Sequence, residues 1–237
     1  MPEVIDRLEA VKQYRRGERP AKKKQERESD LKPGISARAL ADTPTQFHVT
    51  VLPTAPFLAV PENSSETRDY LPIGWLEPPI VPSNKLRFIK DADLWHFAIL
   101  TSRIHMAWLR YVGGRIKSDF QYSIGIVYNA FPWPTSTEVQ KSWARKLAQG
   151  VLDARALILA MFPESTLADL YDATTMKPEL RRAHRALDAA VDRLYRATPF
   201  GSDRERVEHL FGLYEKLVAP LSAAAKPKRP PGTRAMV

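Results

Sequence analysis

The chain has 237 residues, of which 44% are hydrophobic, so it can bury one large core or two smaller ones. Its 36 lysines and arginines exceed its 27 aspartates and glutamates, and the formal net charge of +9 favours an anionic partner such as a nucleic acid or a membrane surface. The absence of cysteine excludes disulfides, thiolate metal sites, zinc fingers and cysteine nucleophiles.

Hydropathy and the distribution of charge further narrow the class of protein to which the chain can belong. The sequence has no run of about 18 apolar residues, and its N-terminus is charged where a signal peptide would be apolar. We therefore expect no membrane partner and a cytoplasmic location. Residues 83–121 carry seven basic against three acidic side chains, so an anion-binding surface is expected in this middle block.

The first part of the chain changes from helical to β-rich patterning. Apolar residues at helical spacing predict a helix over Pro2–Arg16, and Gly17 suits its end. A basic linker with almost no apolar content follows it. Short β-rich runs bounded by prolines then predict strands at 47–52, 57–60 and 85–89.

A long helix is predicted over Asp93–Val112, because apolar residues recur there at helical intervals for about five turns. Gly113 and Gly114 end it. The next segment, RIKSDFQYS at 115–123, reads as one extended strand. Two elements would hold this strand: the buried helix before it and the rigid FPWP sequence at 131–134 after it. A recognition element needs pre-organisation of this kind.

The last third of the chain is helical. Apolar stripes predict helices over Val139–Met161, Pro178–Arg196 and Ser202–Val218, the last with a capping box formed by Ser202 and Glu205. Short connections between them predict a small three-helix bundle, separate from the region before it.

These segments together predict an α+β protein, in which an irregular mixed α/β domain precedes the bundle. The expected parts are an N-terminal helix and basic linker (1–40), the mixed domain (41–136), the helical bundle (137–220) and a disordered basic tail (221–237).

Lys117 and Asp119 are the candidate binding residues with the clearest chemistry. On an extended strand, side chains two residues apart leave from the same face. Lysine donates to guanine O6 and N7 and aspartate accepts from cytosine N4, so the pair can read one G·C base pair in the major groove. The alternative is a solvated surface charge pair. Alternation adds Gln121 to the same face and turns Phe120 and Tyr122 away from it.

Catalytic motifs are missing from the sequence. It contains no glycine-rich phosphate loop, no GxSxG elbow and no HExxH motif. His96 and His105 are interpreted as packed or capping residues, and the aromatic residues around the basic segment as core rather than as base-stacking platforms. We therefore expect no catalytic residue, no metal site and no cofactor in this chain.

The sequence resembles the C-terminal part of the MmeI-like, type IIL restriction-modification enzymes, which join a nuclease, an adenine methyltransferase, a target recognition domain and a helical tail in one polypeptide. The resemblance covers nearly the whole chain, with its segments in the right order. Matching stretches are ALADTPTQF at 39–47, FLAVPENSSETRDYLPIGWL at 57–76, SNKL at 83–86, HFAILTSRIHMAWLR at 96–110, GRIKSDFQYSIGIVYNAFPWP at 114–134 and LADLYDATTMKPELRRAHRALDAAVDRLY at 167–195.

The resemblance implies that the mixed domain is the C-terminal portion of a target recognition domain. By position, Lys117 and Asp119 match the family's base-reading pair, Gln121 a third specificity position, and Lys85 lies near another. The sequence departs from the family at two positions, where Gly113 replaces a usual cysteine and Ala130 a usual asparagine.

The resemblance also implies the partners. They are double-stranded DNA, with Arg110, Arg115 and Ser118 on its phosphates, and methyltransferase and nuclease domains or a subunit that would use S-adenosylmethionine and Mg²⁺. The chain would then be a fragment or a separate subunit. The alternative function is a basic helical interaction or scaffold protein with only non-specific nucleic-acid binding, and a free-standing enzyme is a third reading.

Overall fold

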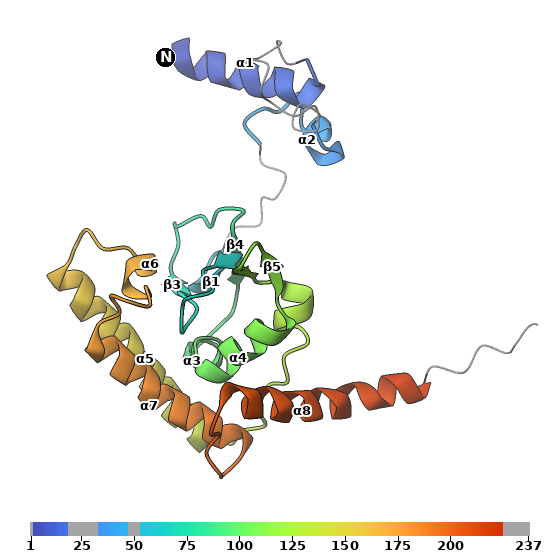
Figure 1. Cartoon of the computed structure of the whole chain (residues 1–237). Helices are drawn as coiled ribbons and strands as arrows, with labels where there is room; N and C mark the ends of the chain where they lie inside the picture. The colour runs from blue at the N-terminus through green and yellow to red at the C-terminus, as the bar shows by residue number, and fades with distance from the viewer. Residues whose placement is uncertain (1, 19–32, 47–52, 225–237) are drawn as a thin grey trace, which may run out of the picture. The chain divides into compact units, whose positions relative to one another are not determined.

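The computed structural model describes residues 2–18, 33–46 and 53–224, with side chains as far as residue 220. It divides the chain into two units, Met1–Leu52 and Pro53–Val237, which are described one at a time (Figure 1). The predicted strand at 47–52 and most of the predicted basic linker lie outside the described residues. Of the predicted tail, residues 221–224 continue the last helix, and the remainder also lies outside.

The first unit consists of two helices, α1 (Pro2–Arg16) and α2 (Ile35–Ala39). The predicted bounds of α1 are confirmed. Gly17 follows α1 with a φ of 79°, a conformation that glycine adopts without steric penalty. Arg15 connects α1 to the chain beyond α2, because its guanidinium donates to the carbonyl oxygens of Leu40 and Gln46 at 2.9 and 2.7 Å.

Two small antiparallel sheets form the β part of the second unit, with strand orders β3-β1-β4 and β2-β6-β5. The strands are β1 (Phe57–Pro61), β2 (Asn63–Ser64), β3 (Gly74–Leu76), β4 (Leu86–Ile89), β5 (Gly114–Ile116) and β6 (Asp119–Gln121). Strand β1 is central, and its first four side chains are all buried, which explains an uninterrupted apolar run in place of alternation. The strands predicted at 57–60 and 85–89 are confirmed as β1 and β4.

The prediction of one long helix over residues 93–112 is wrong, because the segment forms two helices, α3 (Leu94–Leu100) and α4 (Arg103–Val112). Ser102 breaks the helix with an extended backbone (φ −82°, ψ 162°) and donates its hydroxyl to the carbonyl of Ile99 at 2.6 Å. The break gives α4 its own N-terminus, where the amide of Arg103 donates to the carboxylate of Asp188 at 2.7 Å. An anion at a helix N-terminus is stabilising, which offsets the interruption.

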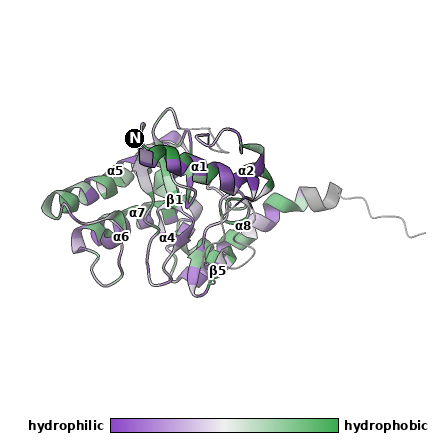
Figure 2. Cartoon of the chain, turned by 90° about the horizontal axis from the view of Figure 1, so that it is seen from above, coloured by the Kyte–Doolittle hydropathy of each residue, from purple (hydrophilic) through white to green (hydrophobic). Residues whose placement is uncertain are grey.

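The C-terminal region contains α5 (Glu138–Met161), α6 (Leu167–Leu170), α7 (Pro178–Tyr195) and α8 (Asp203–Ala224), so the three predicted helices are confirmed as α5, α7 and α8. The described part of α8 carries both hydrophobic and hydrophilic residues (Figure 2). Ser202 caps α8 by accepting the amide of Glu205 at 3.2 Å, which is one half of the predicted capping box. The Glu205 carboxylate accepts the amide of Gly201, and not that of Ser202, at 3.2 Å.

The C-terminal helices do not stand apart from the mixed domain, and this part of the prediction is corrected. Helix α5 packs along α7 and α3, while α8 packs against α4. Trp108 on α4 lies 5.2 Å from the ring of Phe211 and 6.2 Å from that of Tyr214, both on α8. One hydrophobic core therefore extends from β1 to α8.

A buried polar network links the mixed domain to the C-terminal helices. Tyr70 donates to Asp188 on α7 at 2.6 Å and stacks on His184 with ring centroids 4.1 Å apart. His184 Nε2 lies 2.6 Å from the hydroxyl of Tyr171, which accepts from Arg155 on α5 at 2.7 Å. Buried polar groups must be hydrogen-bonded to be tolerated, so this network fixes the register of α5 and α7 on the domain.

A second cluster of charges joins α4, α7 and α8. Asp203 at the start of α8 accepts from Arg103 at 2.8 Å and from Arg110 at 2.9 Å, and it also pairs with Arg206 at 3.1 Å. Burial acts to raise the pKa of Asp203, but the hydrogen bond and charge of Arg103, together with the other two arginines, lower it below its ordinary value. Arg206 continues the cluster to Asp192 on α7 at 2.6 Å.

Replacement of Asp188 by asparagine should change the pH dependence of stability. Burial raises the pKa of Asp188 to about 6, against the hydrogen bonds from Tyr70 and the Arg103 amide. The native protein therefore holds this proton more tightly than the unfolded chain, and the stability from the neutral carboxyl is present below about pH 4 and lost as pH rises through about 6. Relative to Asp188→Asn, the wild-type free energy of unfolding should fall between pH 4 and 6 and stay level above that, as measured by urea titration.

Parallel pH profiles for the two proteins would contradict this assignment. Asp203 has a lowered pKa, so it makes the free energy of unfolding rise with pH, but it does so in both proteins. The difference between the wild type and Asp188→Asn therefore does not contain its contribution.

Candidate nucleic-acid interface

The segment predicted as one reading strand is a β hairpin, and this prediction is corrected. Ile116 pairs with Asp119, so the chain reverses over a two-residue loop, Lys117–Ser118, between β5 and β6. Lys117 has a φ of 57°, a region in which glycine is favoured. Lys117 and Asp119 consequently do not alternate along one strand; they lie together at the end of the hairpin.

Arg115 stabilises the loop of the hairpin. Its guanidinium donates to the carbonyl of Ser118 at 2.7 Å and lies over the ring of Phe120 at 4.1 Å. Since Arg115 and Phe120 are cross-strand partners, they share the face of the sheet that turns toward the core. Phe120 is buried on that face, as the sequence predicted.

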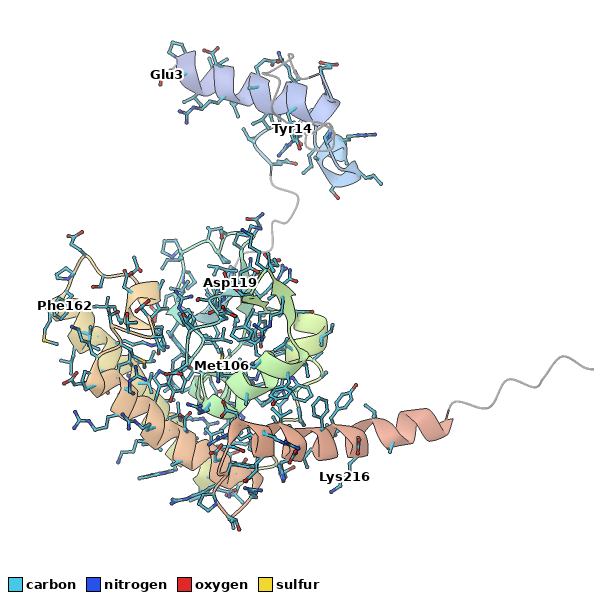
Figure 3. The ribbon with its side chains drawn as sticks, in the orientation of Figure 1. Glu3, Tyr14, Met106, Asp119, Phe162 and Lys216 are labelled. Carbon is cyan, nitrogen blue, oxygen red and sulfur yellow. The ribbon has the colours of Figure 1, made fainter. Side chains whose placement is uncertain are left out.

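The opposite face of the β2-β6-β5 sheet is largely polar, with Ile116 as its one exposed hydrophobic side chain among the paired residues. Asp119 and Gln121 leave β6 on this face, and their cross-strand neighbours are Ile116 and Gly114 on β5 and Asn63 on β2. Asp119 is exposed, and its carboxylate accepts the amide of Glu66 at 3.3 Å. Figure 3 labels Asp119 at the hairpin, apart from Met106 in the interior.

Buried aromatic residues form the support beneath the hairpin. Tyr122 is 1% exposed, and its hydroxyl lies 3.0 Å from Nε2 of His105 on α4. Phe131 packs on the same imidazole, with ring centroids 4.6 Å apart. Burial lowers the pKa of His105 to about 3, so its ring is neutral. The interpretation of the aromatics around the basic segment as core is confirmed for Tyr122 and Phe131, but Tyr111 is 59% exposed. His96 caps α3 through Asp93.

Glu62 joins the two sheets and adds a second group of charges beside the hairpin. Its amide donates to the carbonyl of Lys85 at 2.9 Å, and its carbonyl accepts the amide of Tyr122 at 2.7 Å. Its carboxylate binds Arg87 at 2.9 Å and lies 4.0 Å from Nζ of Lys85. A shallow depression of about 400 Å³ lies here, lined by Glu62, Arg87 and residues 121–124.

Sequence reasoning missed Glu62 and Arg87. Glu62 lies between β1 and β2 and Arg87 lies within β4, and only the pairing of segments far apart in the sequence brings them to Gln121. No local pattern carries that signal.

The structure brings most of the predicted site residues together. Those on the hairpin or beside Glu62 are Lys85, Arg115, Lys117, Ser118, Asp119 and Gln121. Arg110 is the exception, because its guanidinium binds Asp203 at 2.9 Å and the carbonyl of Arg68 at 3.0 Å. Its side chain is 23% exposed, and its role is to hold α4 to α8.

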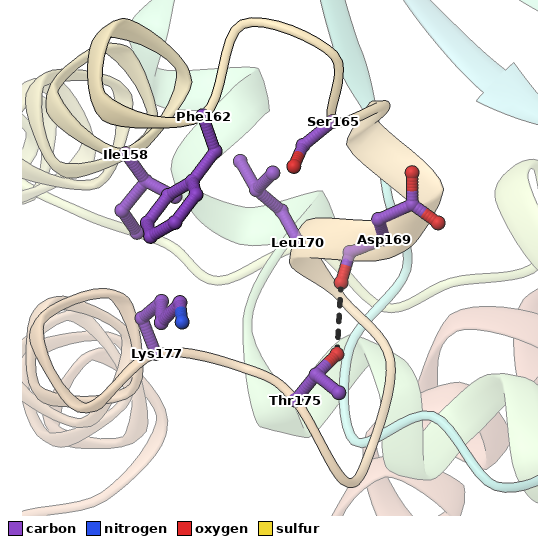
Figure 4. Close-up of a pocket in the computed structure, with 7 residues that line it drawn as sticks. All are labelled: Ile158, Phe162, Ser165, Asp169, Leu170, Thr175 and Lys177. Atoms are coloured by element: carbon purple, nitrogen blue, oxygen red, sulfur yellow. Dashed lines mark hydrogen bonds between the residues drawn. The ribbon is translucent and has the colours of Figure 1, made fainter.

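A separate cavity of about 150 Å³ lies where α5, α6 and the start of α7 meet (Figure 4). The Asp169 side chain points away from it, because its carboxylate accepts from the amide and hydroxyl of Thr166. The ammonium of Lys177 lies 4.6 Å from the ring centroid of Phe162. The polar groups do not converge in this cavity, so it is a packing feature between helices.

The described residues contain neither a candidate metal site nor a candidate membrane span. Those residues hold no cluster of three or more histidine, aspartate or glutamate side chains placed to bind a metal ion. None of the helices in the same ranges has the length and apolar content required to span a membrane.

An exposed hairpin on a rigid buried support, with opposite charges and a carboxamide on its surface, defines a recognition module. Residues 1–135 match the family described as "MmeI, target recognition domain", and residues 136–222 match "MmeI, C-terminal domain". The chain therefore belongs to the MmeI family, in which it comprises target recognition and C-terminal sequence.

Known proteins of the same kind match most of the chain. DNA methyltransferase A of Bacillus subtilis (strain 168) is 38% identical over 200 residues, which are 84% of this chain and 22% of that protein. The structure of the type IIL restriction-modification enzyme MmeI in complex with DNA superimposes with a TM-score of 0.78 and 34% identity, over 92% of this chain and 27% of that one. The chain thus spans about a quarter of the length of these relatives.

Replacement of Gly113 by alanine should destabilise the connection between α4 and β5, from which the hairpin begins. A Cβ at Gly113 would lie 2.5 Å from the carbonyl oxygen of Leu109, a backbone atom at the end of α4 that cannot move alone. We expect Gly113→Ala to lower the free energy of unfolding by roughly 1–3 kcal/mol. Gly150→Ala is the matched control: it lies within α5 with open space around it, and should raise stability by about 0.5–1 kcal/mol. Equal effects in urea unfolding would contradict the account.

The positive φ at Lys117 predicts a stabilising glycine substitution. A non-glycine residue in the left-handed region is strained by about 1–2 kcal/mol, so Lys117→Gly should raise the melting temperature. Ser118→Gly should lower it, because Ser118 has no positive φ and glycine only adds entropy to the unfolded chain. Differential scanning calorimetry that ranked the two variants in the reverse order would show that the loop has another conformation.

Proposed function

We propose that this chain is a sequence-specific recognition module for double-stranded DNA, in which Lys117, Asp119, Gln121 and Lys85 read base edges in the major groove. The observation that carries the proposal is the hairpin, whose end and outer face present Lys117, Asp119 and Gln121, with Lys85 close by at Glu62. A two-stranded β ribbon fits the major groove, where donor and acceptor patterns distinguish all four base pairs. The DNA complex of the MmeI relative supports this choice of partner.

Lys117 and Asp119 supply complementary chemistry at the end of the hairpin. The lysine ammonium donates to guanine O6 and N7, while the aspartate accepts from cytosine N4. Asp119 is already oriented, because one of its oxygens accepts the Glu66 amide and the other has no partner within the described residues. The fixed carboxylate therefore needs little reorganisation to read a cytosine.

The strain at Lys117 also supports a functional role. Glycine would satisfy the loop with less strain, but it has no donor with which to read a base. Backbone strain of this kind is typical of functional sites, where the side chain matters more than the stability of the turn.

Phosphate contacts would come from positive groups that remain partly exposed around the hairpin. Arg115 and Arg87 are 44% and 41% exposed and flank the reading residues, and Ser118 lies in the loop itself. Such contacts position a protein on DNA without reading sequence. Arg115 and Arg87 also have internal partners, Ser118 and Glu62, but they keep a large exposed fraction. We leave out Arg110, because its side chain is only 23% exposed and binds both Asp203 and the Arg68 carbonyl.

The chemical reaction belongs to other domains or to a partner subunit in this proposal. The relatives are a DNA methyltransferase and a restriction-modification enzyme, so the module would direct adenine methylation, with or without cleavage, in the cytoplasm. S-adenosylmethionine and Mg²⁺ would be bound by those catalytic parts. The hairpin would select the sequence on which they act.

A charge exchange at the end of the hairpin should change the sequence that the chain selects. Lys117→Glu with Asp119→Arg places an acceptor where the donor stood and a donor where the acceptor stood, so a preferred G·C pair should become C·G at one position. The readout is sequencing of duplexes retained by the full chain from a pool with a randomised window. Discrimination at that position should change by about 1–3 kcal/mol.

Lys146→Glu with Asp153→Arg provides the charge-matched control, since both residues are exposed on α5, away from the hairpin. This variant should retain the wild-type motif. An unchanged motif in the hairpin variant would refute the base-reading roles. If the wild-type chain selects no motif, and its affinity for every duplex falls steeply as the salt concentration rises, the alternative of non-specific nucleic-acid binding is correct.

A further inference from the structure

A row of three residues crosses the exposed face of the β2-β6-β5 sheet. Gln121 on the central strand β6 pairs with Asn63 on β2 and with Gly114 on β5. Residues directly opposite each other in an antiparallel sheet project from the same face, with Cβ atoms about 5 Å apart. The row therefore places two carboxamides and one position without a side chain next to each other.

Neither carboxamide has a hydrogen-bond partner among the described residues. Asn63 is exposed and Gln121 is half-buried, and both side chains can still offer a donor and an acceptor. Asn63 follows Glu62, whose backbone bonds to Lys85 and Tyr122 hold β2 in place. The asparagine is thus presented from a fixed backbone.

Gly114 determines where the Gln121 side chain can lie. A Cβ at Gly114 would be 3.1 Å from Oε1 and 3.6 Å from Cβ of Gln121. The Gln121 carboxamide therefore lies across the space that a side chain on β5 would fill. Any larger residue at position 114 would push the carboxamide away from β5.

From this geometry we propose that Asn63 is an additional base-reading residue and that Gly114 is a positioning residue that acts through Gln121. The two carboxamides form an adenine-reading pair, because asparagine and glutamine each match the N7 acceptor and N6 donor of adenine. Their separation of about 5 Å and the base-pair rise of about 3.4 Å place them over neighbouring base pairs. This inference rests on the proposed function, since it assumes that the hairpin face meets the major groove.

The test is selection of randomised duplexes by the full chain and by four variants. Asn63→Ala and Gly114→Ala should each reduce discrimination for A·T at one position by about fivefold or more, at neighbouring positions of the motif. The controls are Asn129→Ala, an exposed asparagine in the loop after Tyr128, and Gly125→Ala, where a Cβ meets only the Ser123 hydroxyl at 4.0 Å. Both controls should keep the wild-type motif.

A double-variant comparison separates a positioning role from a structural one. Because Gly114 acts through Gln121, Gly114→Ala should have no further effect on discrimination in a Gln121→Ala background. Full additivity, or an unchanged motif in Asn63→Ala and Gly114→Ala, would overturn the inference while leaving the proposed function intact. A wild-type chain that selects no motif would instead overturn the proposed function, and this inference with it. Thermal melting of each variant shows that loss of selectivity is not loss of folding.

Discussion

Two contacts of one buried residue, Tyr122, fix the sheet that we propose to contact DNA. Its amide donates to the carbonyl of Glu62 at 2.7 Å, which joins the hairpin sheet to the end of β1. Its hydroxyl lies 3.0 Å from the neutral imidazole of His105, which joins the same sheet to α4. The exposed ends of β5 and β6 can therefore be short, because their orientation is fixed from below and not by the length of the strands.

The C-terminal helices extend this support. Asp188 on α7 accepts hydrogen bonds from the first amide of α4 and from the hydroxyl of Tyr70. Asp203 on α8 binds the two arginines of α4, Arg103 and Arg110. These buried hydrogen bonds are directional, so they fix the orientation of α4 relative to α7 and α8 in addition to stabilising the packing. A side chain that reads a base must be held within a fraction of an ångström, and a rigid scaffold of this kind provides that precision. The target recognition and C-terminal sequences thus form one folded unit beyond residue 52.

Four amphipathic helices and the strands β1 and β4 were predictable from sequence, whereas the β5-β6 hairpin and the break between α3 and α4 were not. Helices α1, α5, α7 and α8 follow apolar stripes of several turns, a signal that local sequence carries in full. The hairpin was missed because its loop is Lys-Ser, without the glycine or asparagine that usually marks such turns. The break at Ser102 was missed because the contact that compensates for it is distant in sequence: the amide of Arg103 donates to Asp188, 85 residues further along the chain.

The candidate site was predictable in its chemistry and not in its geometry. Residue types alone pointed to Lys117, Asp119 and Gln121, but their placement on a hairpin and the contribution of Glu62 and Arg87 depend on pairing between distant segments. Arg110 illustrates the converse: a basic residue in the right stretch of sequence is occupied by an internal partner, Asp203. Charge near a recognition element is a poor guide to contact until its internal partners are known.

We propose that the outer face of the β2-β6-β5 sheet contacts DNA, and titration of the isotope-labelled full chain with its selected duplex, followed by NMR, is the sharpest test. We expect the largest shifts and the intermolecular contacts at residues 114–121 together with Asn63 and Lys85. Shifts confined to the outer surfaces of α5 and α7, with the hairpin signals unchanged, would contradict it.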